Sequence, residues 1–243
     1  MKSLKLFGVV LSVYALMFAA GLVMQRSARA VHAGNDATEV TSEIESARIT
    51  SSSSSNPGPN ASRYRLEASR SKFIAHALAG GLLWFKGHDH LVAVRDFTGE
   101  ARLDPDSLPA SSLEIVAKAA SMEETSSVFT EPQKQIINKE LREIVLLPEQ
   151  YPDITFRSTG VTGKMTAANQ YELRIAGNLT LLGVTRPVTI PTKVTVTGNE
   201  LRAQGEFSID RSDFKVKATS AFHGMVRVRH TVKFEFDMVG QRF

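Results

Sequence analysis

The sequence predicts an all-β fold in which an antiparallel sheet closes into a barrel or packs as a sandwich, with one covering α-helix. The main observation is a period-two alternation of apolar and polar residues, broken only by turns, from Tyr171 to Met238. Strand side chains point alternately to the two faces of a sheet, so each such segment has one apolar face that must be covered. One segment, residues 130–148, instead has apolar residues at helical spacing. An uncharged run near the N-terminus predicts a further hydrophobic helix ahead of the sheet.

The N-terminal segment has the pattern of an export signal. Leu6 to Met24 carry no charge, follow Lys2 and Lys5, and precede Ala28-Arg29-Ala30, which is similar to a signal-peptidase site. The run is longer than the roughly 7–15 residues of an ordinary signal-peptide core and close to the roughly 20 that span a bilayer. We therefore assign residues 1–30 to a signal peptide or signal anchor and expect the rest of the chain to be exported.

The segment that follows predicts a tether and then one domain. Residues 31–62 are rich in Ser, Thr, Glu, Ala and Asn, include a Ser run followed by Asn-Pro-Gly-Pro-Asn, and have few apolar side chains to bury, which is typical of a flexible linker. Residues 63–243 are long enough to form a single domain with a substantial core. If the N-terminal segment is not cleaved, this domain is tethered to a membrane.

Composition excludes several functional classes. The formal net charge is +4, but the leader holds four of the 29 basic residues, which leaves 25 basic against 25 acidic residues in the exported part. A neutral domain gives no electrostatic reason to expect a nucleic-acid partner. The chain has no Cys, so disulfides, thiolate catalysis and Cys-ligated metal or haem are excluded. The common nucleotide-binding, hydrolase and metalloprotease motifs are also absent, so we expect no cofactor and no enzymatic activity.

The first half of the domain contains several predicted strands. Residues 64–67 and 71–76 are expected to pair as a hairpin across the turn 68–70. Further strands are expected at 93–103 and 113–119, because apolar residues alternate in both.

The helix is predicted from its capping signals. Thr130 is placed as the N-cap, Pro132 in the first turn and Gln133 at the capping-box position. Apolar residues then recur at helical spacing, at Ile136, Ile137, Leu141, Ile144 and Val145. Pro148 ends this helix, and residues 151–156 return to a strand pattern.

The second half contains the clearest strands. Alternation predicts strands at 171–181, 188–196, 201–210 and 226–238. In the last of them, Val228, Val232 and Phe234 share one face with His230, while charged residues occupy the other face.

Three ordered motifs in these strands carry a family resemblance. Residues 151–158 (Tyr-Pro-Asp-Ile-Thr-Phe-Arg-Ser), 177–188 and 207–214, followed by the closing strand 226–239, resemble the successive signatures of YceI-like proteins. The resemblance implies an extended, lipocalin-like antiparallel barrel that is exported to the bacterial periplasm, secreted or tethered to the inner membrane. It also implies an elongated apolar cavity that holds a polyisoprenoid or an isoprenoid-quinone-like lipid.

The inward face of such a barrel supplies the candidate ligand-binding residues. Aromatic side chains would form the walls, and small residues between them would leave room for a lipid. The alternative is a filled core, which would make the chain a structural envelope protein. His230 is either a partner for a lipid head group or an ordinary core histidine, and Trp84 is placed at the cavity mouth or in the rim packing. The candidates are Phe73, Trp84, Phe97, Ile115, Phe156, Leu179, Phe207, His230 and Phe234.

The segment His88-Asp89-His90 departs from the family pattern and suggests a second hypothesis. On a strand, His88 and His90 would project from the same face, a spacing that suits two imidazole ligands of Zn or Cu. A third ligand would have to come from His76, His223 or His230. This hypothesis makes the chain a metal-binding protein or a metal-dependent enzyme. The alternative is a glycine-flanked turn whose polar side chains bond to local backbone groups.

Overall fold

The computed structural model describes residues 60–221 and 225–243. The predicted N-terminal helix, nearly all of the predicted linker and His223 lie outside the described residues. Within the described ranges, no helix is both long and apolar enough to cross a bilayer.

The described residues form one sheet of twelve antiparallel strands. The strands are β1 (Ser62–Leu66), β2 (Lys72–Gly80), β3 (His90–Val94), β4 (Phe97–Leu103), β5 (Ser112–Lys118), β6 (Met122–Glu124), β7 (Asp153–Ala167), β8 (Gln170–Leu181), β9 (Val184–Thr197), β10 (Glu200–Asp210), β11 (Ser220–Ala221) and β12 (Val226–Arg242). The helical elements are α1 (Glu131–Glu140), the π-helical turn η5 (Leu141–Leu146) and the 3₁₀ turns η1 (Ala68–Arg70), η2 (Trp84–Lys86), η3 (Leu108–Ala110), η4 (Ala119–Ser121) and η6 (Arg211–Phe214).

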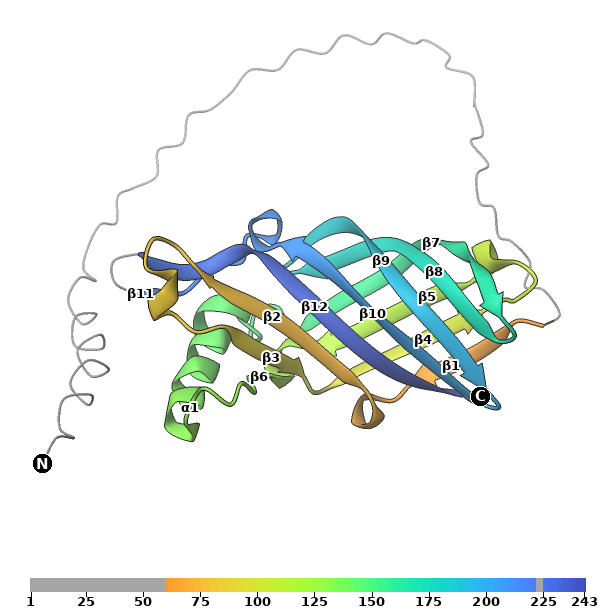
Figure 1. Cartoon of the computed structure of the whole chain (residues 1–243), viewed down its shortest axis with the longest axis horizontal. Coiled ribbons are helices and arrows are strands. Elements are labelled where there is room, and N and C mark those ends of the chain that lie inside the picture. The colour runs from red at the N-terminus through yellow and green to blue at the C-terminus, as the bar shows by residue number, and fades with distance from the viewer. Residues whose placement is uncertain (1–59, 222–224) are drawn as a thin grey trace, which may run out of the picture. The chain divides into compact units, whose positions relative to one another are not determined.

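The sheet closes into an eight-stranded barrel. Strands pair in the order β1-β4-β5-β7-β8-β9-β10-β12, and β12 returns to β1 through the register Tyr64 to Arg242 (Figure 1). The strand alternation predicted for residues 171–238 is confirmed in β8, where Tyr171, Leu173 and Ile175 are buried on one face, and it is interrupted in β12 between Val228 and Val232. Closure removes the unpaired edges that an open sheet would expose, and it encloses the apolar faces.

The predicted hairpin between residues 64–67 and 71–76 is wrong. β1 and β2 do not pair with each other, because both lie along the same side of the long strand β12. The turn η1 interrupts the strand without reversing its direction, and β12 stays bonded on both sides of it. The Glu67 N–H donates to the Val239 carbonyl (2.9 Å), and the Val239 N–H donates to Ser71 Oγ (3.0 Å). The two strands are therefore one strand with a kink, held from the side by β12.

A second break of this kind, between β3 and β4, lets the sheet continue beyond one end of the barrel. The strand expected at residues 93–103 is divided at Arg95 and Asp96 into β3, which pairs with β2 and β6, and β4, which pairs with β1 and β5. As a result β2, β3 and β6 form a flap of sheet that continues from β12, and α1 lies beside this flap (Figure 1).

The predicted helix is present and is capped as expected. The Thr130 N–H donates to Gln133 Oε1 at 2.8 Å, as a capping box requires. The helix continues as η5 and ends at Leu147, whose left-handed φ of 48° precedes Pro148. Leu141 and Leu146 are buried against the barrel.

Candidate functional site

The interior of the barrel contains seven of the nine candidate ligand-binding residues. All seven belong to the hydrophobic core or pack against it, and they differ in exposure. The buried ones are Phe97, Phe156 and Leu179, and the partly buried ones are Phe73, Ile115, Phe207 and Phe234.

Four of these side chains form a connected run of aromatic rings inside the barrel. Phe207 and Phe234 lie directly opposite each other on β10 and β12, with their rings stacked and their centroids 5.0 Å apart. Phe73 on β2 is 5.9 Å from Phe234 and 6.5 Å from Phe97. Phe97 is buried, whereas the other three face inward and yet stay partly accessible. An inward-facing ring that remains accessible has space beside it.

Elsewhere in the barrel, aromatic rings fill the room that the small residues leave. A Cβ at Gly205 would lie 2.7 Å from Phe236 Cζ and 2.3 Å from the Pro191 carbonyl oxygen. A Cβ at Gly177 would lie 2.5 Å from Phe156 Cζ. Each ring lies across a glycine of the neighbouring strand, so these glycines provide packing contacts and no cavity. The expectation that the small interior residues leave room for a lipid is therefore wrong at Gly205.

The barrel wall is not continuously hydrogen-bonded beside the accessible rings. The ladder between β9 and β10 ends at the pair Thr192 and Gly205, although β10 continues past Phe207 to Asp210. The turn η6 packs against both strands beyond this point and buries Phe214 completely. The interior next to Phe207 is thus closed by side chains of a short turn and not by a strand ladder.

His230 points away from the interior, contrary to the strand alternation. The register between β12 and β2 shifts between Val228 and Val232, so that the chain bulges and ejects the intervening residues. His230 has 56% of its side chain exposed, and its Nδ1 lies 3.8 Å from Asp210 Oδ1. Arg229 Nε fills the gap in the ladder by donating to the Ala79 carbonyl at 2.9 Å.

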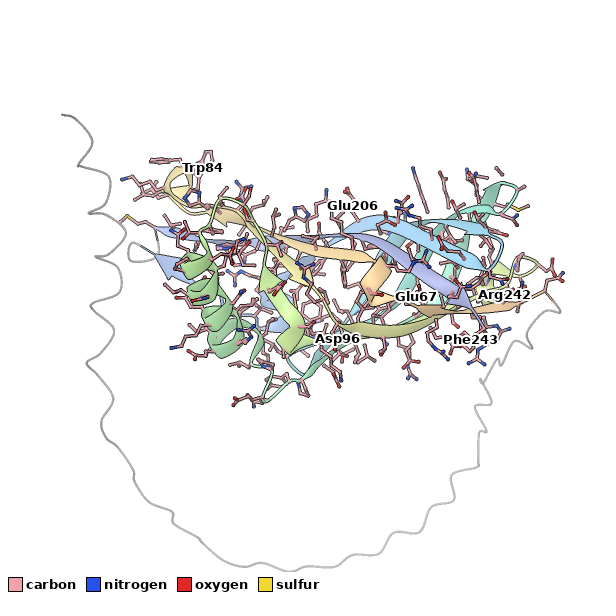
Figure 2. All side chains as sticks on the ribbon, turned by 90° about the horizontal axis from the view of Figure 1, so that it is seen from below. Glu67, Trp84, Asp96, Glu206, Arg242 and Phe243 are labelled. Carbon is pink, nitrogen blue, oxygen red and sulfur yellow. The ribbon has the colours of Figure 1, made fainter. Side chains whose placement is uncertain are left out.

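Trp84 also lies outside the barrel, at one tip of the molecule. It sits on η2, between β2 and β3, and is 56% exposed (Figure 2). Trp84 and His230 are thus the two ligand-binding candidates that lie outside the interior. Both line one surface hollow of about 320 Å³, together with Gly80, Gly81, Arg227 and Arg229.

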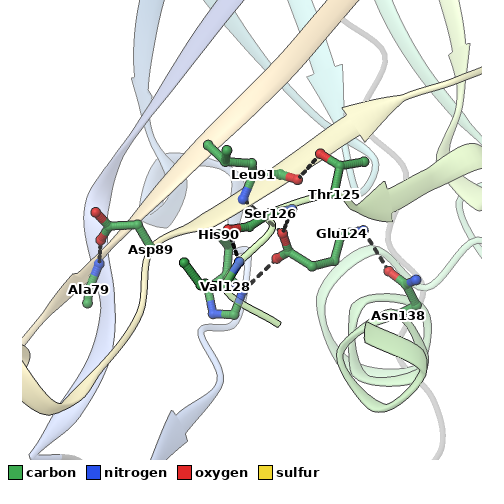
Figure 3. Close-up of polar contacts among 9 residues, drawn as sticks. All are labelled: Ala79, Asp89, His90, Leu91, Glu124, Thr125, Ser126, Val128 and Asn138. Carbon is green, nitrogen blue, oxygen red and sulfur yellow. Dashed lines mark hydrogen bonds and ion pairs between the residues drawn. The ribbon is translucent and has the colours of Figure 1, made fainter. Parts of the chain in front are cut away.

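The His88-Asp89-His90 segment makes contacts within the protein. Asp89 accepts the Ala79 N–H at 2.8 Å, and His90 Nδ1 lies 2.8 Å from Glu124 Oε2 (Figure 3). The rings of His88 and His90 lie 5.7 and 5.2 Å from the ring of Phe129. Only Asp89 bonds a backbone group, as the alternative of a polar turn expects, whereas His90 lies at the start of β3 and contacts a side chain 34 residues further along the chain.

Of the three candidate third ligands, His76 and His230 lie elsewhere and His223 is outside the described residues. His76 lies at 3.4 Å from Glu235 on the outer face of β2 and β12, and His230 lies at Asp210. Among the side chains of residues 60–221 and 225–243, no three of His, Cys, Asp or Glu converge on a site that could hold a metal ion.

Glu124 is the main residue of this cluster that the sequence did not indicate. Its carboxylate is fully buried and accepts the N–H groups of Leu91 (3.1 Å) and Ser126 (2.7 Å) in addition to contacting His90. Burial raises the pKa of this carboxyl, but the hydrogen bonds from His90, Ser126 and Leu91 outweigh it and hold the pKa below its ordinary value. Because the Glu124 N–H also donates to Asn138 Oδ1 at 2.7 Å, the cluster fixes α1 to β3 and β6 (Figure 3).

Comparison with known proteins identifies the family to which this domain belongs. A family model described as a YceI-like domain matches residues 64–240. Curated relatives include a UPF0312 protein of Yersinia enterocolitica (30% identical over 120 residues, 49% of this chain and 54% of that protein) and a UPF0312 protein of Azotobacter vinelandii (32% identical, with the same coverage). The matched part of the chain thus spans about half the length of these relatives.

Two solved structures share the fold. BcnA of Burkholderia cenocepacia superimposes with a TM-score of 0.57 at 21% identity and covers 72% of this chain and 98% of its own. A polyisoprenoid binding domain from Saccharophagus degradans, implicated in plant cell wall breakdown, superimposes with a TM-score of 0.53 at 11% identity and covers 74% and 98%. At these identities the likeness is one of fold.

Proposed function

Because the chain belongs to the YceI-like domain family, we propose that its barrel binds a polyisoprenoid or a similar amphiphilic lipid and sequesters or carries it. The family membership and the fold shared with a polyisoprenoid binding domain support this proposal. The function proposed is binding and not catalysis.

One observation carries the proposal, namely the run of inward-facing rings formed by Phe73, Phe207 and Phe234. These rings are in contact with one another, face the interior and remain partly accessible. A prenyl chain bound along these rings would bury its apolar surface away from water, which contributes about 0.8 kcal/mol of binding free energy per buried CH₂. A wall of phenylalanine rings favours an unbranched or methyl-branched hydrocarbon chain over a polar ligand.

The route into the interior is proposed to pass between β9 and β10. The ladder between these strands stops at Gly205, and only η6 with Phe214 covers the wall beyond it. A displacement of η6 would expose Phe207 without breaking a ladder hydrogen bond between β9 and β10. The lipid head group would then remain at this opening, near solvent.

The proposed location rests on the N-terminal sequence. We propose that residues 1–30 export the chain to the periplasm or beyond, or anchor it in the inner membrane, and that residues 31–62 connect this segment to the barrel. The uncharged run from Leu6 to Met24 supports export.

A thermal-shift experiment with a polyprenol or an isoprenoid quinone tests the proposal. A ligand at 100 times its Kd adds about 2.7 kcal/mol of stability, which corresponds to a rise in Tm of about 5–10 °C for a domain of this size. The double variant Phe207→Ala with Phe234→Ala should lose most of this rise. Ser208→Ala, on the outer face of the same strand, is the matched control and should keep it. An unchanged Tm with every prenyl lipid tested would instead favour a filled core and a structural role.

A further inference from the structure

An exposed apolar tip projects from one end of the barrel. Leu82, Trp84 and Phe85, in the turn between β2 and β3, are 78%, 56% and 63% exposed. Figure 2 shows Trp84 at this tip, at the end away from Arg242 and Phe243. Exposed large apolar residues that gather in one place mark a binding surface more often than isolated ones do.

The tip is held by backbone contacts. The Leu83 N–H donates to the Met225 carbonyl at 2.9 Å, and the Lys86 N–H donates to the Leu83 carbonyl at 2.9 Å. Gly81 has a φ of +90°, and a Cβ there would lie 2.4 Å from the Met225 carbonyl oxygen. Because only glycine fits at this position, the turn presents its apolar side chains outward from a fixed backbone.

Cationic side chains lie in and beside the apolar tip, Lys86 within the turn and Arg227 and Arg229 along the hollow next to Trp84. Lys86, Arg227 and Arg229 are all exposed. Within the part of the chain that the structure describes, none of the three takes part in an ion pair. The carboxylate of the same turn, Asp89, is engaged by the Ala79 N–H. The tip therefore combines apolar side chains with positive charge that has no counter-charge on the described protein.

A hollow lies directly behind the tip. Trp84, Arg227, Arg229 and His230 line it with the backbone of Gly80 and Gly81. Its volume of about 320 Å³ leaves ample room for a phosphate group, and Arg227 and Arg229 supply the two guanidinium groups that would bind one.

We propose that this tip docks on the surface of an anionic lipid bilayer. Leu82, Trp84 and Phe85 enter the interfacial region, where tryptophan is favoured because its ring is apolar and its N–H is polar. Lys86 and Arg227 attract anionic head groups, and the hollow behind Trp84 receives one lipid phosphate. An exposed tryptophan next to cationic side chains that have no ion pair in the described part of the chain is the combination that favours an anionic bilayer surface as the partner. This inference is independent of whether the barrel holds a prenyl lipid.

Trp84 is the only tryptophan of the chain, so its fluorescence reports on the tip even when the N-terminal segment is present. The full chain is incorporated into vesicles of phosphatidylcholine, with or without phosphatidylglycerol, and with acyl chains brominated for quenching. We expect a blue shift of Trp84 emission and quenching by the brominated lipids, both stronger with phosphatidylglycerol. Lys86→Gln with Arg227→Gln should lower the ratio of docked to undocked tips on anionic vesicles by about 30-fold.

A matched control moves the reporter to the other end of the barrel. Met165 is 61% exposed and pairs with Tyr171 near the turn between β7 and β8, far along the barrel from Trp84. Trp84→Phe combined with Met165→Trp should therefore show neither the blue shift nor the quenching. The proposal is overturned if Trp84 and the tryptophan at position 165 respond alike, or if Trp84 emission stays that of an exposed indole on anionic vesicles. It is also overturned if Trp84 is shielded only by a soluble protein partner.

Discussion

Removal of the buried Glu124 carboxylate should destabilise the barrel far more than removal of its exposed neighbour. Glu124 Oε1 accepts two backbone N–H groups, those of Leu91 and Ser126, and Oε2 contacts His90. Glu124→Ala leaves both backbone donors unpaired in a buried site, at about 1–3 kcal/mol each, and also loses the contact with His90. The expected decrease in the free energy of unfolding is about 3–5 kcal/mol.

Two further variants separate charge from hydrogen bonding. Glu124→Gln can keep its oxygen on the two backbone N–H groups and lose only the charge, so the expected decrease is about 1–2 kcal/mol. Glu123→Gln is the matched control, because Glu123 lies on the opposite face of β6 and pairs with Arg95 at the surface. Glu123→Gln should lower the free energy of unfolding by less than about 0.5 kcal/mol. Urea unfolding followed by circular dichroism measures all three.

The same carboxylate predicts a pH dependence. The pKa of Glu124 is held below its ordinary value near 4.5, so its charged form stabilises the folded protein above that pH, and this stability is lost as the pH falls through the folded-state pKa. Between about pH 6 and about pH 3, the wild-type chain should therefore lose more stability than Glu124→Gln. The reasoning is refuted if Glu124→Ala unfolds within about 0.5 kcal/mol of the wild type, or if Glu124→Gln shows the larger loss in acid.

Two other predictions concern the interior. Gly205→Ala should cost about 1–3 kcal/mol of stability, because the Pro191 carbonyl oxygen that its Cβ meets at 2.3 Å is backbone and cannot move freely. Gly160→Ala, where a Cβ has no neighbour within 4 Å, should change urea unfolding little, and equal effects of the two would contradict the packing described. Val232→Trp should abolish the rise in Tm with prenyl lipids by filling the accessible interior, whereas Thr231→Trp, on the exposed face of β12, should not. Retention of the lipid-dependent rise in Val232→Trp would place the ligand elsewhere.

Strands were predictable where the local pattern carries the information. Residues 171–181 alternate without interruption, and the structure buries Tyr171, Leu173 and Ile175 on one face as the pattern requires. The signal for the helix is equally local, since Thr130 and Gln133 form the capping box that marks its start. Both features depend on residues within a few positions of each other.

Features that depend on distant partners were not predictable. The pairing of β1 and β2 is decided by β12, whose paired residues lie 147 to 178 residues further along the chain. The bulge that ejects His230 is visible only in the register between β12 and β2. Glu124 gave no signal, because a carboxylate in the stretch Met122-Glu123-Glu124-Thr125 is indistinguishable from a solvated one until Leu91, Ser126 and His90 are placed around it.

The most direct test of the central claim is native mass spectrometry of the full chain purified from a bacterial envelope in mild detergent, with organic extraction of the same sample. The account predicts one bound prenyl lipid per chain, which is released on extraction and is absent from the double variant Phe207→Ala with Phe234→Ala. A chain that carries no prenyl lipid and takes up none on reconstitution with polyprenols or isoprenoid quinones would contradict it.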